Sequence, residues 1–339
     1  MGGPQLAGPG VIVNYPAGHA LRLPAVPAVA YVVADAGTGQ VLAARDPHGL
    51  LRPASTLKML TAVTLVPLLN PDATVVASAQ ATNVTPNVAG LVRGQPYKVS
   101  DLFRALLLIS ANDAAIALAQ ATGSLRHGIA LMNAEAHHLQ AYDDTAADPN
   151  GLDAPGQHVS AYDLALIARQ ALATPALMGY DATRVASFPV TARTSETLFN
   201  QNDLLTRYPG GIGGKIGWTN AAGATYIGMA RRNGVTLIVT ILHCTPLTEV
   251  AYASKLLDWG FAQDGRVTPV GVLVSPITPA PARPSPVATA RSAPRPPVTA
   301  GTITEPSGGL AAASIALIVF AAAAAVILIL LRRRAPSRR

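Results

Sequence analysis

The alternation of apolar and polar positions predicts two β-hairpins, one near each end of the folded part of the chain. The paired apolar runs are 28–35 with 40–44, and 224–230 with 235–242. Residues 36–39 (Ala-Gly-Thr-Gly) separate the first two runs, and Asn233-Gly234 separates the second two. Short apolar runs that flank glycine-containing turns of this kind are typical of hairpins.

Apolar residues at helical spacing fill the region between the hairpins and continue after the second. They predict helices over 56–69, 102–109, 160–172 and 248–261. Ser100 and Asp101 are placed to cap the second of these helices, and residues 160–163 resemble a capping box at the start of the third. Strands from both ends around a helical middle predict an α+β fold, in which one antiparallel sheet is flanked by helices and carries an inserted helical lobe.

The strongest hydrophobic feature of the chain is at its C-terminus. Residues 310–331 form an apolar run with a single serine, and Arg332, Arg333 and Arg334 follow it directly. At a rise of about 1.5 Å per residue the run spans about 33 Å, enough to cross a hydrocarbon core of about 30 Å. We therefore expect one C-terminal transmembrane helix in the cell membrane, with a cytoplasmic basic tail behind it and the main domain outside the cytoplasm.

A segment rich in Pro, Ala, Thr and Ser precedes this run, and its bias is strongest over 275–308. Such a composition favours extended chain over a packed core, so we expect a stalk. The predicted division is an N-terminal extension over 1–27, a folded domain over 28–264, the stalk over 265–308, the membrane span over 309–331 and the basic tail over 332–339. The first residues lack the basic start and apolar run of a signal peptide, so we expect that an export signal is missing from this reading frame.

Charge is unevenly distributed along the chain. The formal net charge is +7, from 25 Lys and Arg against 18 Asp and Glu, but eight of the arginines and only one acid lie from Ser275 onward. The folded part is therefore neutral, which argues against a nucleic-acid partner. The single cysteine, Cys244, excludes an internal disulfide and a multi-cysteine metal site. The histidines show no metal-ligand spacing and no phosphate-binding glycine loop is present, so we expect neither a metal nor a cofactor.

Candidate chemistry begins with a Ser-x-x-Lys pattern, Ser55 to Lys58, at the start of a predicted helix. Three residues apart on a helix, the two side chains share a face and their functional groups can meet. Serine is a poor nucleophile until a base accepts its proton, and a lysine can do so when burial or a nearby cation keeps it neutral. Taken alone, the pattern is also compatible with a helix cap and a solvated lysine.

Two further segments change this picture. Ser110-Ala111-Asn112 follows an apolar run and presents a hydroxyl and an amide at alternate positions. Residues 213–219 (Gly-Gly-Lys-Ile-Gly-Trp-Thr) precede the second hairpin, and their glycines let a substrate backbone approach closely. Taken alone, the first is a turn between helices and the second a glycine-rich loop.

Together, the three segments resemble the motif set of the serine penicillin-recognising enzymes: Ser-x-x-Lys, Ser-x-Asn and Lys-Thr-Gly, in that order. Within that group the chain is most similar to the D-alanyl-D-alanine carboxypeptidases, the low-molecular-mass penicillin-binding proteins. The resemblance covers about residues 28–261 and includes the segments 35–39, 148–152, 160–165 and 256–261. It implies the β-lactamase/DD-peptidase fold.

The resemblance also implies a role for each matching residue. Ser55 is then the acylated nucleophile and Lys58 its general base. Ser110 passes a proton to the leaving D-alanine.

Substrate binding is implied for five other residues. Asn112 is expected to bind the peptide stem, and Lys215 to hold positive potential near the Ser110 hydroxyl and the substrate carboxylate. Gly217 gives the substrate close access, and the N–H of Trp218 completes an oxyanion hole with that of the nucleophile. Thr219 is a candidate to replace a hydroxyl that the motif lacks here.

That hydroxyl is lost because the Lys-Thr-Gly motif reads Lys215-Ile216-Gly217. Glu249 also occupies the region where some members have an arginine, so charge-assisted recognition of a free carboxylate is expected to be weaker. The implied function is a membrane-anchored serine carboxypeptidase that removes terminal D-alanine from peptidoglycan pentapeptide stems and is trapped by β-lactams. The alternatives are a DD-endopeptidase, a serine β-lactamase, for which no deacylating glutamate is evident, and a catalytically silent peptidoglycan-binding homologue.

Overall fold

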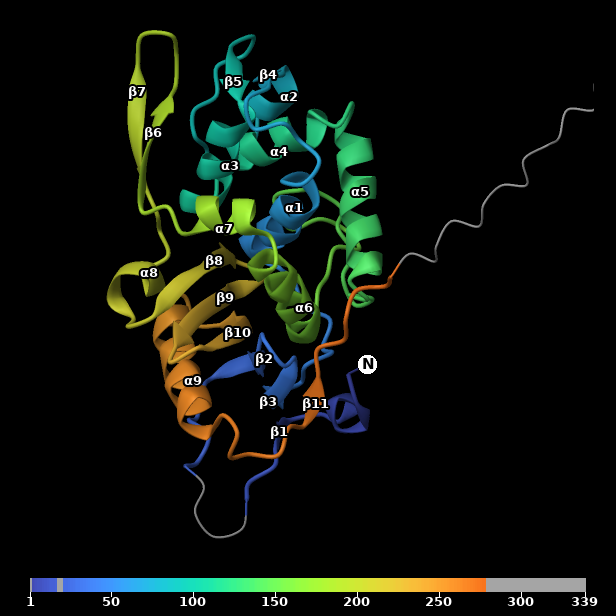
Figure 1. The fold of residues 1–339 in the computed structure, drawn as a ribbon. Coiled ribbons are helices and arrows are strands. Elements are labelled where there is room, and N and C mark those ends of the chain that lie inside the picture. Colours follow the sequence, from blue (N-terminus) through green and yellow to red (C-terminus); the bar gives the residue numbers. More distant parts are fainter. Residues whose placement is uncertain (1, 17–20, 279–339) are drawn as a thin grey trace, which may run out of the picture. The chain divides into compact units, whose positions relative to one another are not determined.

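The fold is built around a seven-stranded antiparallel sheet (Figure 1). The structure is a computed structural model, and it describes residues 2–16 and 21–278. The strand order is β1 (Val11–Val13), β3 (Gln40–Arg45), β2 (Ala28–Asp35), β10 (Val235–Cys244), β9 (Gly223–Arg232) and β8 (Gly211–Thr219), and β11 (Gly271–Val272) also pairs with β3. Within the described residues β8 is therefore an edge strand, paired with β9 on one side only.

Both predicted hairpins are present. β2 pairs with β3 in antiparallel register, and β9 pairs with β10 so that Arg232 and Val235 flank the turn. Asn233 and Gly234 in that turn have φ values of 49° and 84°, the left-handed conformation that a tight hairpin turn requires. The Asn-Gly signal thus identified the turn correctly.

Both faces of the sheet are buried. Alternate residues of β2 point to opposite sides: Val32 and Ala34 join the core of the helical lobe, whereas Tyr31 and Val33 join a core with α9 (Glu249–Gln263). Figure 1 shows α9 on one face of the sheet and α6 on the other. Burial on both faces is the reason that this strand has a continuous apolar sequence.

The helical lobe is inserted between β3 and β8. In chain order it contains η2 (Ala54–Thr56), α1 (Leu57–Leu65), β4 (Thr74–Val76), α2 (Ala79–Thr82), β5 (Pro96–Lys98), α3 (Val99–Leu108), α4 (Asn112–Gln120), α5 (Leu125–His138), α6 (Ala161–Leu172), α7 (Pro175–Asp181), β6 (Val185–Pro189), β7 (Ser195–Phe199) and α8 (Leu204–Arg207). The predicted sheet with flanking helices and an inserted lobe is confirmed. Ser160 caps α6 as predicted, accepting a hydrogen bond from the N–H of Asp163.

Chain on both sides of the domain limits predicted at 28 and 264 packs onto the sheet. Before β2, Leu6 in η1 (Pro4–Ala7) is buried and β1 pairs with β3. After α9, β11 pairs with the same strand, and the N–H of Val272 donates to the carbonyl of Gly2 at 2.7 Å. The described N-terminal extension and the start of the predicted stalk therefore belong to the domain.

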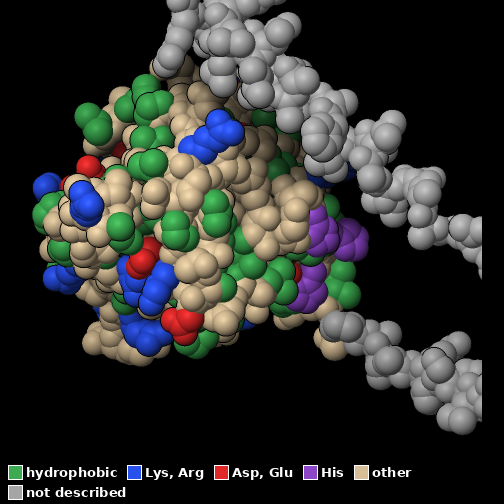
Figure 2. Space-filling model, turned by 90° about the horizontal axis from the view of Figure 1, so that it is seen from above, with side chains coloured by type: hydrophobic (Ala, Val, Ile, Leu, Met, Phe, Trp, Pro, Cys, Tyr) green, Lys and Arg blue, Asp and Glu red, His purple; other side chains and the backbone are tan. Residues whose placement is uncertain are grey.

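No helix within residues 2–16 and 21–278 has the length and apolarity to cross a bilayer. The span predicted over 309–331 and the tail over 332–339 lie outside the described residues, as does most of the predicted stalk. Figure 2 shows one face of the domain, on which acidic side chains lie next to basic ones. This mixture agrees with a folded part of balanced charge.

Candidate active site

Ser55 and Lys58 lie where η2 passes into α1. Three residues apart at this junction, they point toward each other, and Lys58 Nζ is 2.9 Å from Ser55 Oγ. Ser55 lies at the N-terminal end of the helix, where backbone N–H groups have no partner in the preceding turn. The structure thus brings together the two residues that the sequence predicted to meet.

Lys58 is fully buried among oxygen acceptors. Its Nζ lies 2.7 Å from Asn112 Oδ1 and 2.6 Å from the carbonyl oxygen of Asn150. Burial lowers the pKa of Lys58 well below its ordinary value, and the charge of Lys215 lowers it further. A neutral amine has two N–H groups and one lone pair; when the two hydrogens bond to the oxygens of Asn112 and Asn150, the lone pair faces Ser55. This arrangement equips Lys58 to accept the serine proton.

A tight loop over 148–152 supplies one of these acceptors, a role that no sequence pattern predicted. The Asp148 carboxylate accepts hydrogen bonds from the N–H groups of Asn150 at 2.8 Å and Gly151 at 2.7 Å. Gly151 has a φ of 80°, and a Cβ there would overlap the carbonyl of Ala54. Glycine therefore lets the loop pack closely against the segment that carries Ser55. A main-chain carbonyl leaves no side-chain signal from which this contact could be predicted.

Ser110 and Asn112 occupy the sharp link between α3 and α4. Ser110 has a φ of 61°, an uncommon conformation for a residue with a side chain. Its Oγ is buried and has no hydrogen-bond partner among the described residues. Asn112 donates from Nδ2 to the carbonyl of Thr85 at 2.7 Å, while its Oδ1 faces Lys58. The Ser110 hydroxyl is thus left without a partner beside Asn112 and Lys58 in the described structure.

Lys215 is buried on β8, and its Nζ donates to the carbonyl of Ile216 at 2.8 Å. Burial lowers the pKa of Lys215 to about 7, against an opposing effect of the Asp181 carboxylate. That carboxylate accepts a hydrogen bond from the N–H of Gly214 at 2.7 Å. Lys215 was predicted to lie near the Ser110 hydroxyl; no hydrogen bond joins them in the described part of the chain.

Gly217 brings β8 directly against Ser55. A Cβ at this position would lie 2.5 Å from Thr225 Oγ1, 2.7 Å from the backbone nitrogen of Ser55 and 2.8 Å from that of Thr56. Any side chain would therefore push the strand away from the serine. The segment 213–219, taken alone as a glycine-rich loop, is in fact the edge strand that closes this site.

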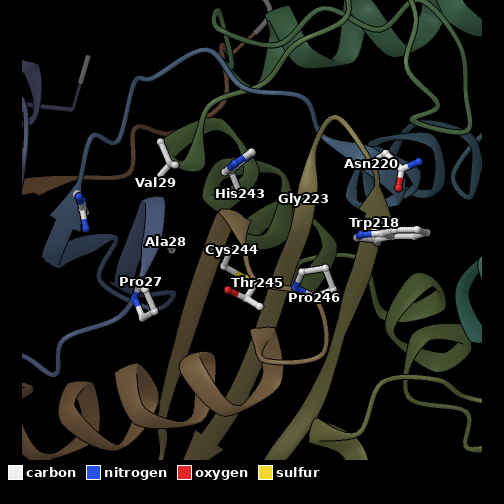
Figure 3. A pocket seen from close by; sticks show the side chains of 11 residues that line it. Pro27, Ala28, Val29, Trp218, Asn220, Gly223, His243, Cys244, Thr245 and Pro246 are labelled. Carbon is white, nitrogen blue, oxygen red and sulfur yellow. The ribbon is translucent and has the colours of Figure 1, made fainter.

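A cavity of about 380 Å³ opens onto Ser55, with Ser110 and Trp218 in its wall. A neighbouring cavity of about 820 Å³ shares Trp218 and Pro246 with it (Figure 3). Trp218 is 57% exposed and stands between the two. Within the described residues, no group of three or more His, Cys, Asp or Glu side chains could hold a metal ion.

Thr219 does not line the cavity that opens onto Ser55. Its hydroxyl donates to Asp153 Oδ1 at 3.1 Å and accepts a hydrogen bond from the N–H of Ala222 at 3.0 Å. Side chains alternate between the two faces of a strand, and the Thr219 side chain forms its hydrogen bonds outside the cavity. Its role in substrate binding stays a prediction.

A family profile described as D-alanyl-D-alanine carboxypeptidase matches residues 18–245. The chain belongs to this family. D-alanyl-D-alanine carboxypeptidase DacB2 of Mycobacterium tuberculosis is 40% identical to it over 253 residues, which are 73% of this chain and 86% of the relative. DacC of Escherichia coli is 32% identical over 271 residues, 76% of this chain and 66% of the relative. The chain spans 61% of DacF of Bacillus subtilis.

Solved structures agree with this membership. A D-alanyl-D-alanine carboxypeptidase from Mycobacterium tuberculosis superposes with a TM-score of 0.72 at 38% identity, covering 78% of this chain and 99% of the other. A variant of a Streptomyces DD-transpeptidase gives a TM-score of 0.67 at 28% identity, covering 70% and 99%. This member of the carboxypeptidase family is accordingly a serine carboxypeptidase hydrolase with the DD-peptidase fold.

Proposed function

We propose that this enzyme removes the terminal D-alanine from peptidoglycan pentapeptide stems through an acyl-enzyme on Ser55, and that β-lactams trap it at that stage. The observation that carries the proposal is the 2.9 Å contact between Lys58 Nζ and Ser55 Oγ in a buried site where the pKa of Lys58 is lowered. Curated relatives that bear the name D-alanyl-D-alanine carboxypeptidase support the substrate class.

Acylation begins with proton transfer from Ser55 to neutral Lys58. The serine oxygen then attacks the carbonyl carbon of the penultimate D-alanine, and negative charge develops on the carbonyl oxygen. The N–H groups of Ser55 and Trp218 stabilise that oxygen, the first at a helix N-terminus and the second on the edge strand. An edge strand can also pair with an extended substrate backbone, which suits β8 to a peptide stem.

Collapse of the tetrahedral intermediate breaks the bond to the leaving nitrogen. Ser110 gives a proton to that nitrogen, and its buried hydroxyl takes a replacement from Lys58, which then returns to the neutral form. A water molecule next attacks the acyl ester with Lys58 as base. Ser55 is regenerated, and the shortened stem is released with a new carboxylate.

The test is release of D-alanine from diacetyl-Lys-D-Ala-D-Ala by the purified enzyme. We expect turnover by the wild type and by Ser187→Ala, which alters an exposed serine on β6, and none above background by Ser55→Ala. Release of D-alanine by Ser55→Ala at the wild-type rate would reject the proposal. So would a folded wild type that neither cleaves this peptide nor binds penicillin.

We also infer that the domain works outside the cytoplasm, anchored in the cell membrane by the span predicted over 309–331. The arginines that follow the run support a cytoplasmic tail. The full chain should sediment with membranes, and external protease should digest its domain in intact spheroplasts. A full chain recovered wholly in the soluble fraction would contradict this location.

A further inference from the structure

An acidic side chain lines the cavity that opens onto Ser55, and the proposed reaction makes no use of it. Glu249 is the first residue of α9 and is half-buried. It lines the cavity together with Ser55, Ser110 and Ile216. A carboxylate in the first turn of a helix interacts favourably with the helix dipole, so this position suits a negative charge.

One oxygen of this carboxylate has no donor. Glu249 Oε2 is buried, and none of the described residues donates a hydrogen bond to it. A buried acceptor without a donor is unfavourable, and nearly all such groups in folded proteins bond to protein, water or ligand. Because Glu249 lines the cavity, a ligand that brings an N–H group there can pair with its carboxylate in a charge-assisted hydrogen bond.

The rest of the described wall carries neutral donors, such as the amides of Asn87 and Gln201, but no positive charge. Ile216 and Leu247 are apolar, and no Lys or Arg is among the described residues that line this cavity. The nearby Lys215 does not line it, and its Nζ donates to a main-chain carbonyl. A free carboxylate entering here would therefore meet a like charge at close range in a partly desolvated space.

The position of Ser110 indicates which part of the substrate enters. In the proposed reaction Ser110 protonates the leaving nitrogen, and Ser110 lies in the wall of this cavity. Asn112, which is expected to hold the stem on the other side of the scissile bond, does not line it. The cavity is therefore placed to receive the residue that leaves.

We propose that this cavity is a leaving-group subsite for a residue that carries an N–H donor, an amide or an ammonium, in place of a free carboxylate. Glu249 is its specificity-determining residue. This inference rests on the proposed function, and it leaves the bond that breaks unchanged. Stems whose last residue is amidated, or whose D-alanine carbonyl is joined to an amine of a second peptide, have the required chemistry.

The test compares three substrates that differ only at the leaving residue: diacetyl-Lys-D-Ala-D-Ala, its C-terminal amide, and its aminoethylamide. The first presents a free carboxylate, the second a neutral N–H donor and the third a cation. We expect kcat/KM for the amide and the aminoethylamide to exceed that for the free acid by about 10-fold to 100-fold. The aminoethylamide should be the best of the three, because it adds an opposite charge.

Two variants assign the preference to Glu249. Glu249→Gln keeps the shape and an acceptor oxygen but removes the charge, so the advantage of the aminoethylamide over the amide should disappear. Glu196→Gln, on the exposed side of β7, should keep the wild-type ratios. Penicillin acylation of each variant confirms that the nucleophile is intact.

The inference is overturned if the wild type cleaves the free acid as fast as the amide, or if Glu249→Gln leaves all ratios unchanged. In either case normal penicillin acylation would show that the proposed function stands while the subsite assignment fails. Absence of both acylation and cleavage of all three substrates by folded wild type would reject the proposed function and this inference with it.

Discussion

The ε-amino nitrogen of Lys58 lies 2.9 Å from the hydroxyl oxygen of Ser55. Three segments that are distant in sequence hold these two side chains in place. The first residue of α4 contributes the Asn112 side chain, and the loop over 148–152 contributes the carbonyl of Asn150. Strand β8 closes the other side through Gly217. The two side chains are therefore aligned before a substrate arrives, so the proposed reaction does not require them to reorganise.

Replacement of Lys58 by arginine should stop acylation. A guanidinium stays charged at all accessible pH values and cannot accept the serine proton. We expect the second-order rate constant for acylation by a fluorescent penicillin to fall by about 10²-fold to 10⁴-fold. Lys255→Arg, which changes an exposed lysine on α9, is the matched control and should react normally. A Lys58→Arg enzyme that acylates at the wild-type rate would show that another group takes the proton.

The acylation rate should decline on both sides of an optimum. Lys58 accepts a proton only when uncharged, so the rate falls as the pH drops through its lowered pKa. Lys215 has a pKa lowered to about 7 by burial; above that pH the site loses the positive charge that attracts the negative charge developing in the reaction, so the rate falls again. Stopped-flow acylation across the pH range measures both limbs.

The variant Lys215→Arg tests whether Lys215 causes the decline in acylation rate at high pH, because an arginine there keeps its charge. If this variant acylates, its rate should no longer fall above about pH 7. A wild-type rate that rises continuously to about pH 10, the ordinary range for lysine, would contradict the lowered pKa values of both side chains.

Gly217→Ala should separate β8 from the nucleophile. The added Cβ would lie 2.5 Å from Thr225 Oγ1 and 2.7 Å from the backbone nitrogen of Ser55, and two of its three nearest atoms are backbone. We expect a loss of about 1–3 kcal/mol in the free energy of unfolding together with slower acylation. Gly179→Ala in α7 meets nothing within 4 Å and should be neutral or slightly stabilising. Equal behaviour of the two variants in urea unfolding and acylation would refute the close contact.

Stability should fall as the pH rises from about 4 to about 8, in part because of Asp144. Its carboxyl group is buried, burial raises its pKa to about 8, and neither oxygen has a partner among the described residues. Over this interval the folded state keeps a proton that the unfolded state has released, at a cost of at most about 1.4 kcal/mol per pH unit from this group.

Asp144→Asn removes that titration. The variant should therefore be more stable than the wild type near pH 8, and the difference should shrink toward pH 4. Asp72→Asn, at an exposed position, is the control and should follow the wild type. Thermal unfolding of the three proteins at several pH values measures this, and a difference independent of pH would contradict the raised pKa.

Sequence patterns correctly predicted the elements whose structure depends on residues close to them in the chain. Both hairpins follow from their turns, and Ser160 marks the start of α6. The helix predicted over 56–69 ends instead at Leu65, since Pro67 has no N–H to continue the helix. α3 begins at Val99, whose N–H donates to the carbonyl of Ala73, so no serine cap is needed there.

The rest depends on contacts that are distant in sequence. β8 was hidden because its glycines have low strand propensity, and its pairing with β9 decides its structure. The outer limits of the domain depend on β1 and β11 meeting β3. In the site, Ser55 with Lys58 was predictable from helical spacing, and Ser110 with Asn112 from the family resemblance. The carbonyl of Asn150 could not be predicted, since its role depends on how a loop folds back.

The central claim is that Ser55 becomes acylated with Lys58 as its base. The most direct measurement is the intact mass of the folded enzyme after incubation with benzylpenicillin. We predict that the wild type gains the mass of one penicillin, that proteolysis locates it on the peptide containing Ser55, and that Ser55→Ala gains nothing. No added mass on folded wild type, or the same added mass on Ser55→Ala, would contradict the account.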